Sequence, residues 1–174
     1  NARASVTALR LEGPGPSVEA RCQHLRATIG TAVATEELHS VNAVALWREL
    51  RDVTLLAEPR DRIVWRLSLP PSEAARVVAA IRANNPNAEV FYDWSGGLVW
   101  LSLPASAAMG NDASEMLVRG AVNNHGHATL IRAPSDMRAR VRVFQPLAPA
   151  LAALTARVKD AFDPKNILNP GRMG

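Results

Sequence analysis

The feature that most constrains the fold is an alternation of apolar and polar side chains over residues 62–69, interrupted only by Val64. Ile63, Trp65 and Leu67 fall on one side of an extended chain, and Arg62 and Arg66 fall on the other. Because successive side chains of a strand point to opposite faces, this pattern predicts a half-buried β-strand rather than a helix. The apolar face of that strand must be covered by a second layer.

Residues 70–103 predict a helix and a hairpin after this strand. Pro70-Pro71 precede a helix for which Ser72 is the expected N-cap, and Asn84-Asn85-Pro86 end it. Its apolar residues at helical spacing are Ala74, Val77, Val78 and Ile81. We expect a second strand at 88–92 and a third at 98–103, joined by the turn-forming residues 93–97.

Residues 112–132 predict one more helix and one more strand. Asp112 and Glu115 are spaced like a capping box, and we expect the helix that follows to bury Ala113, Met116, Leu117 and Ala121. Residues 127–132 read as the last strand. The order strand, helix, strand, strand, helix, strand predicts an α+β fold: a ferredoxin-like split β-α-β antiparallel sheet with helices mainly on one face.

The flanking segments predict additions to this unit. Residues 6–11 and 31–35 are expected strands, residues 18–29 an expected helix, and Ser40 the cap of another helix, so that this βα portion extends the same sheet. A last helix follows Pro146, with an apolar stripe formed by Leu147, Leu151, Leu154, Val158 and Phe162. We expect residues 1–174 to form a single domain that ends in an ordered tail.

Composition and charge exclude several classes of protein. A hydrophobic content of 48% excludes disorder, and the net charge of +4 comes from arginines spread along the chain rather than from a basic tail that would bind nucleic acid. The single cysteine, Cys22, falls on a helical apolar stripe, so we expect a buried side chain, no disulfide and a cytoplasmic protein. No apolar run approaches the roughly 20 residues that a membrane helix needs, so no membrane insertion is expected.

The sequence over residues 158–173, Val-Lys-Asp-Ala-Phe-Asp-Pro-Lys-Asn-Ile-Leu-Asn-Pro-Gly-Arg-Met, carries a family resemblance. It resembles the closing signature of FAD-linked oxidases of the vanillyl-alcohol oxidase type, an amphipathic helix followed by F-D-P-x-x-I-L-N-P-G and a basic residue. Together with Gly-His-Ala-Thr-Leu-Ile-Arg-Ala-Pro at 126–134, it is most similar to the E-subunit family of bacterial glycolate oxidases. The resemblance extends over most of the chain, but only the closing signature is highly specific.

The resemblance implies a C-terminal cap domain of a flavin-dependent oxidoreductase that acts on a small 2-hydroxy acid such as glycolate. The cofactor would be FAD, held mainly by a preceding domain, because this chain has no glycine-rich phosphate-binding loop. In such proteins the tail returns toward the flavin domain, which makes Asn169 and Arg172 the candidate cofactor contacts. The implied partners are a homologous flavin subunit and an iron–sulfur subunit, with peripheral attachment to the inner membrane through the complex left open.

Four residues are candidates for the chemistry at the substrate. Arg62, Arg66 and Arg132 lie on expected strands and could present a guanidinium fork to a carboxylate. His127 could act as a base, although His125 and His127 have no third ligand at a recognisable spacing, so we expect no metal. Related catalytic subunits carry a histidine-rich H-x-x-D-G-N-x-H pattern that this sequence lacks, which leaves open whether the subunit catalyses or relays electrons.

Two other classes of function share the expected fold. A ferredoxin-like sheet also serves ligand sensors and RNA-binding modules, but the aromatic residues here do not follow the RNA-binding pattern. A ligand sensor would leave the closing signature without a role. A non-catalytic scaffold would keep the fold and would bind no flavin even in the complete protein.

Overall fold

The computed structural model describes residues 5–31, 33–105, 113–168 and 170. The chain separates into two compact units, Asn1–Arg48 and Glu49–Gly174. The second unit holds the sheet and all of the buried hydrophobic residues that the structure describes. The two units are therefore treated one at a time.

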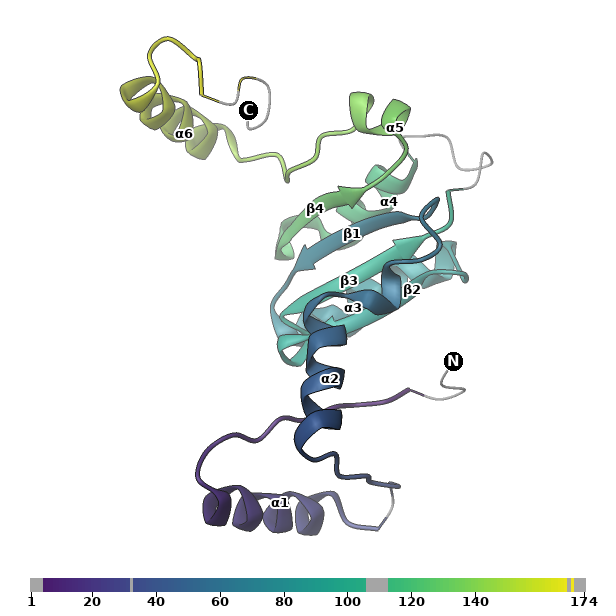
Figure 1. Cartoon of the computed structure of the whole chain (residues 1–174). Helices are drawn as coiled ribbons and strands as arrows, with labels where there is room; N and C mark the ends of the chain where they lie inside the picture. The colour runs from purple at the N-terminus through teal and green to yellow at the C-terminus, as the bar shows by residue number, and fades with distance from the viewer. Residues whose placement is uncertain (1–4, 32, 106–112, 169, 171–174) are drawn as a thin grey trace. The chain divides into compact units, whose positions relative to one another are not determined.

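A four-stranded sheet organises the second unit (Figure 1). Its strands are β1 (Ile63–Ser68), β2 (Glu89–Asp93), β3 (Leu98–Leu103) and β4 (His127–Arg132). They lie in the order β2-β3-β1-β4, and all three pairings are antiparallel. This arrangement confirms the predicted α+β, ferredoxin-like fold, and the bounds of β3 and β4 match the predicted strands residue for residue.

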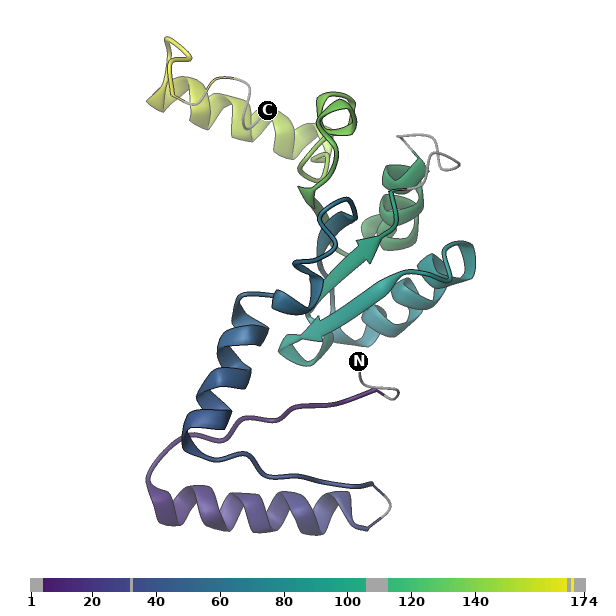
Figure 2. The ribbon, with the colours of Figure 1, turned by 45° about the vertical axis from the view of Figure 1, so that its right-hand side comes forward.

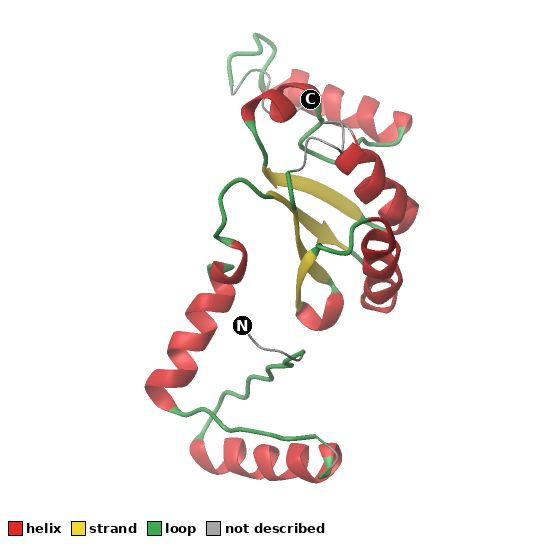
Figure 3. Cartoon of the chain, turned by 90° about the vertical axis from the view of Figure 1, so that its right-hand side faces the viewer, coloured by secondary structure: helices red, strands yellow, loops and turns green. Residues whose placement is uncertain are grey.

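Helices α3 (Pro71–Asn84) and α4 (Ala113–Val122) cover one face of the sheet. Figure 3 shows the strands edge-on with this helical layer beside them. Trp65 and Leu67 of β1 are fully buried against the helices, as the alternation in 62–69 predicts, and Leu101 of β3 is fully buried as well. The core of the second unit lies between this sheet face and the two helices.

Both helices differ in detail from the prediction. Ser72 does not cap α3, because Pro70 occupies the N-cap position and no side chain caps the helix. Met116 is 70% exposed and lies outside the core, whereas Ser114, Val118 and Val122 are buried at spacings of four residues. The apolar face of α4 is therefore rotated from the expected one. The expected cap Asp112 lies outside the described residues.

The C-terminal part of the second unit contains two more helices, α5 (Ser135–Arg140) and α6 (Pro149–Phe162), seen from another angle in Figure 2. The sequence did not predict α5, which is too short to show an apolar period. The predicted helix after Pro146 is confirmed as α6, but no residue of it is buried. Its predicted stripe consists of exposed side chains, from Leu147 at 41% to Phe162 at 83%.

The first unit contains α1 (Gly15–Ile29) and most of α2 (Ser40–Arg51), since the boundary between the units falls after Arg48. The expected strands at 6–11 and 31–35 are wrong, since none of their described residues is in a strand. A strand forms only where a neighbouring strand satisfies its backbone groups, and every ladder in the described chain joins strands of the second unit. The expected extension of the sheet is therefore also wrong, and Cys22 is half-buried rather than buried.

Candidate functional site: the helix-free face and the C-terminal arm

The face of the sheet opposite α3 and α4 carries most of the candidate polar residues. Residues paired across antiparallel strands share a face, and Arg66 is paired with Trp100 of β3 and with Thr129 of β4. We call this side the helix-free face, and its members are Val64, Arg66, Ser68, Glu89, Phe91, Asp93, Leu98, Trp100, Ser102, His127, Thr129 and Arg132. It combines aromatic rings with one central guanidinium group.

Arg66 stands in the middle of the helix-free face. Its side chain is half-buried and makes no hydrogen bond or ion pair with any other residue that the structure describes. His127 is exposed on the same face, where it pairs with Ser68 two residues along β1 from Arg66. The structure thus brings the predicted candidates Arg66, His127 and Arg132 onto one face, and a guanidinium whose donors bind no described residue is suited to binding a carboxylate.

Arg132, the third candidate, is bonded to backbone carbonyl groups. Its Nε donates to the carbonyl of Arg62 at 3.1 Å and its Nη1 to that of Ala57 at 2.6 Å. Its Nη2 donates to the carbonyls of Leu56 at 2.9 Å and Pro59 at 3.2 Å. All three guanidinium nitrogens hold the loop before β1, and four of the five N–H donors are used, so a carboxylate could bind Arg132 through two donors only by displacing part of that loop.

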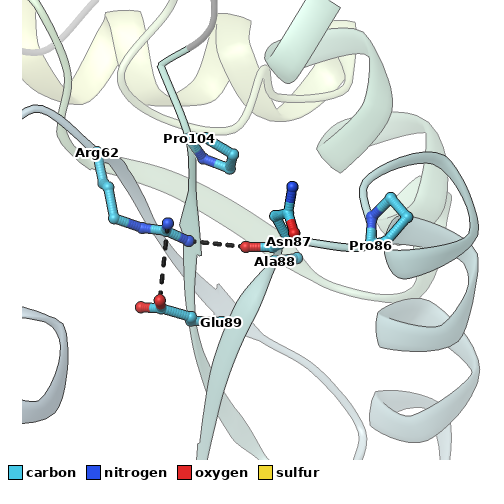
Figure 4. Close-up of a pocket in the computed structure, with 6 residues that line it drawn as sticks. All are labelled: Arg62, Pro86, Asn87, Ala88, Glu89 and Pro104. Carbon is cyan, nitrogen blue, oxygen red and sulfur yellow. Dashed lines mark hydrogen bonds and ion pairs between the residues drawn. The ribbon is translucent and has the colours of Figure 1, made fainter.

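Arg62 is likewise used within the fold, at the rim of a shallow depression also lined by Pro86, Asn87, Ala88, Glu89 and Pro104 (Figure 4). It donates to the hydroxyl of Ser102 at 2.6 Å and to the carbonyl of Asn87 at 2.9 Å, and it lies 3.6 Å from a carboxylate oxygen of Glu89. These contacts join β1 to β3 and to the start of β2. Arg66 differs from both Arg62 and Arg132, because its donors bind no other residue that the structure describes.

Arg119 of α4 forms a polar cluster that the sequence did not reveal. Its side chain is 11% exposed, pairs with Glu115 at 2.8 Å and lies over the ring of Trp65 at 5.4 Å. Desolvation by burial is the main cause that lowers the pKa of Arg119, and Glu115 opposes it. Arg119 also donates to the amide oxygen of Gln145 at 3.1 Å and to the carbonyl of Arg142.

These bonds fasten residues 141–145 along the free edge of β4. The amide of Leu130 donates to the carbonyl of Val143 at 2.8 Å, and the amide of Ala128 donates to the side chain of Gln145 at 3.2 Å. The edge of the sheet is thereby covered, and α6 begins four residues beyond Gln145. No short-range pattern could predict this arrangement, because Arg119 and Gln145 are 26 residues apart.

The C-terminal arm, which we define as residues 146–168, ends in a loop held by Asp163. The Asp163 side chain is buried, and its two carboxylate oxygens accept from the amides of Ile167 and Leu168 at 2.9 Å each. The side chains of Ile167 and Leu168 are 70% and 61% exposed. The predicted cofactor contacts Asn169 and Arg172 lie outside the described residues.

Three of the described helices are poorly suited to bind a dinucleotide phosphate at their N-termini. A dinucleotide phosphate is usually bound by free amides at a helix N-terminus that follows a glycine-rich loop. Helices α1, α3 and α6 instead carry a proline at the first or second position, which removes one of those amides. Within the described ranges, no group of three His, Cys, Asp or Glu side chains could hold a metal ion, and no helix is long and apolar enough to span a membrane.

Two comparisons with known proteins agree with the sequence resemblance. Residues 143–173 match the family model of FAD linked oxidases, C-terminal domain, a family whose cofactor is FAD. The chain is also 31% identical over 146 residues to the glycolate oxidase subunit GlcE of Escherichia coli (strain K12), an alignment that covers 83% of this chain and 36% of GlcE. No solved structure matches the chain. The family match at residues 143–173 and the similarity to GlcE support a C-terminal domain of an FAD-linked oxidase.

Proposed function

We propose that this chain is the substrate-side cap of a flavin-dependent 2-hydroxy-acid oxidoreductase subunit, with glycolate as the first substrate to test. The family match at 143–173 and the similarity to GlcE support an oxidase. The structural observation that carries the proposal is the available guanidinium of Arg66 at the centre of the helix-free face. FAD would supply the redox chemistry from a part of the protein outside this chain.

Arg66 is proposed to bind the substrate carboxylate. A guanidinium presents two parallel N–H donors to a carboxylate, and partial burial strengthens that interaction relative to bulk water. The half-buried rings of Phe91 and Trp100 share the face with Arg66 and would shield a bound substrate from water, while His127 at the border of the face is the candidate proton acceptor. Arg132 remains a weaker candidate because its donors already bind the loop carbonyls.

The apolar stripe of α6 is proposed to dock on the flavin-binding part of the same protein. The stripe lies wholly within the segment that matches FAD-linked oxidases, and the alignment leaves 64% of GlcE (100 − 36) without a counterpart in this chain. Burying each exposed leucine, valine or phenylalanine would contribute about 1.5–3 kcal/mol. Such a surface, exposed in an ordered helix, is typical of an interface.

Several finer assignments belong to the same proposal. Asn169 and Arg172 are the proposed contacts to the cofactor, since they follow the docking arm directly in the sequence. A homologous flavin subunit and an iron–sulfur subunit are the proposed partners. Electron relay without substrate oxidation is the alternative within the same class of protein.

The spectrum of bound flavin tests the proposal. The complete protein that contains this chain is purified, its visible absorbance recorded, and glycolate added under anaerobic conditions without partner subunits. Bleaching of a bound flavin supports a catalytic subunit. A bound flavin that stays oxidised supports the relay alternative, and a protein that never binds flavin contradicts the proposal.

Arg66→Met then tests the carboxylate contact, with Arg76→Met as the matched control. Arg76 lies on α3 and pairs only with Glu73 among the described residues, so its loss leaves the helix-free face unchanged. We expect Arg66→Met to raise the KM for glycolate about 10-fold or more, because a charged hydrogen bond contributes about 1.5–3 kcal/mol, while flavin content stays constant. An unchanged KM would remove Arg66 from the site.

A further inference from the structure

Asp163 is a buried carboxylate in the described C-terminal arm that no role proposed above uses. It is 7% exposed although the residues on both sides of it, Phe162 and Pro164, are exposed. A charged side chain is buried at a surface only where hydrogen bonds replace its water. Its burial therefore indicates that the local fold depends on this group.

The hydrogen bonds around Asp163 close a single turn directly after α6. The Asp163 amide donates to the carbonyl of Lys159 at 2.7 Å, which ends the helix, and the Asp163 carbonyl accepts from the amide of Asn166 at 2.9 Å. Asn166 has a φ of 49°, in the left-handed region that asparagine tolerates better than most residues. The carboxylate then receives the next two amides, those of Ile167 and Leu168.

This geometry requires a short side chain that carries two acceptor oxygens. A carboxylate can accept from both amides at once, whereas the side chain of asparagine has a single acceptor oxygen and alanine has none. The consequence is that Ile167 and Leu168 are held outward with their side chains exposed. Two exposed apolar side chains contribute no burial energy to this chain alone. They stabilise the protein only if another surface covers them.

We propose that Asp163 is the positioning residue of the C-terminal arm, and that it presents Ile167 and Leu168 as the apolar tip that docks on the flavin-binding part of the protein. The inference rests on the proposed function, because it takes that part as the partner. It assigns a physical role to the acidic residue of the F-D-P signature, which acts through the shape of the loop and touches neither flavin nor substrate.

The test uses the complete flavoprotein with Asp163→Ala and Asp163→Asn, and with Asp160→Ala as a matched control. Asp160 lies three residues earlier on α6, is exposed, and makes no hydrogen bond to another described residue. Flavin content per protein, the position of the visible absorbance bands and far-ultraviolet circular dichroism are measured for each variant. A fourth variant, Ile167→Ser with Leu168→Ser, removes the tip and keeps the carboxylate.

We expect Asp163→Ala to retain flavin at least about 10-fold more weakly, with shifted absorbance bands, because two charge-assisted hydrogen bonds are lost. Asp163→Asn should be intermediate, the double serine variant should resemble Asp163→Ala, and Asp160→Ala should match the wild type. Flavin content and bands that stay at wild-type values in folded Asp163→Ala overturn the inference. If Asp163→Ala does not fold, wild-type flavin content in the double serine variant overturns it.

A wild-type protein that binds no flavin gives a different result. It contradicts the proposed function itself, and with it this inference. Normal flavin in the wild type together with normal flavin in Asp163→Ala contradicts the positioning role alone. The two failures are therefore distinguishable from the same set of measurements.

Discussion

At the scale of single residues, the fold of the second unit depends on a glycine position that has no room for a side chain and on an arginine side chain that hydrogen-bonds several carbonyl groups. Gly126, just before β4, approaches β1 so closely that a Cβ atom there would lie 2.1 Å from the carbonyl oxygen of Ser68. Arg132 satisfies four carbonyl groups of one loop. Both positions are set by contacts with residues distant in sequence.

Replacing Gly126 by alanine should therefore destabilise the sheet. Because the clash is with backbone, we expect the free energy of unfolding to fall by about 3 kcal/mol. Gly120→Ala is the control, since nothing lies within 4 Å of its Cβ position and alanine favours the interior of α4 by up to about 1 kcal/mol. Urea denaturation of both variants measures the difference. Equal stability of the two would contradict the close approach of Gly126 to β1.

Tyr92, the single tyrosine of the chain, should ionise at unusually high pH. Desolvation raises its pKa above the ordinary value of 10.0, and the positive charge of Arg82 opposes this only partly. As pH rises through 10, the unfolded chain loses its phenolic proton first, so the folded state loses stability there and is unaffected at neutral pH. An ultraviolet titration of phenolate absorbance checks this. A midpoint at or below that of the denatured protein would refute it.

At the scale of elements, the helices and strands are joined by polar contacts as well as by the core. Arg119 connects α4 to the segment 141–145, and Gln145 connects that segment to the edge of β4. The segment leads directly into α6, so the same contacts define where the C-terminal arm leaves the sheet. The amphipathic pattern of α6 shows which face of the helix is apolar. These contacts show where the segment that leads into α6 is attached to the sheet.

Arg119→Met should release the segment 141–145. Several hydrogen bonds from one partly buried cation are lost, and we expect the free energy of unfolding to fall by about 2–3 kcal/mol. Arg76→Met, which breaks an exposed pair with Glu73, should cost less than about 0.5 kcal/mol. Hydrogen exchange adds a local readout, because the amides of Ala128 and Leu130 should lose protection in Arg119→Met. Unchanged exchange at both amides would argue against the fastening role.

At the scale of the whole chain, stability is concentrated in the second unit. No described residue of the first unit is buried, whereas Trp65, Leu67, Leu101 and their neighbours form a continuous core in the second. Apolar burial is the main favourable contribution to folding. The first unit therefore adds little to the stability of the sheet.

A shortened chain that begins at Glu49 should keep the folded sheet. We expect its melting temperature to lie within about 4 °C of that of residues 1–174, since less than about 1 kcal/mol is removed. Circular dichroism against temperature measures the change, and Leu101→Ala in the same background supplies a destabilised reference at about 2–5 kcal/mol. A shortened chain as unstable as that reference would show that the first unit supports the core.

Much of the fold follows from local patterns in the sequence. The alternation in 62–69 and the spacing of apolar residues in 71–84 and 149–162 report periods of two and 3.6 residues, which depend only on neighbouring side chains. The strands β3 and β4 and the helix α6 were predictable for that reason. The closing signature was likewise readable as sequence, and the family match at 143–173 confirms the resemblance.

The tertiary structure alone decided which polar groups are available for function. Residues 6–11 have the composition of a strand, but a strand needs a partner edge, and none of the described ladders includes them. Arg62, Arg66 and Arg132 are the same kind of residue in similar sequence surroundings, yet the partners that occupy two of them are carbonyl and hydroxyl groups 25–76 residues away. Periodicity is local and hydrogen-bond partners are not, so the sequence determined the elements and the folded chain determined that Arg66 remains available.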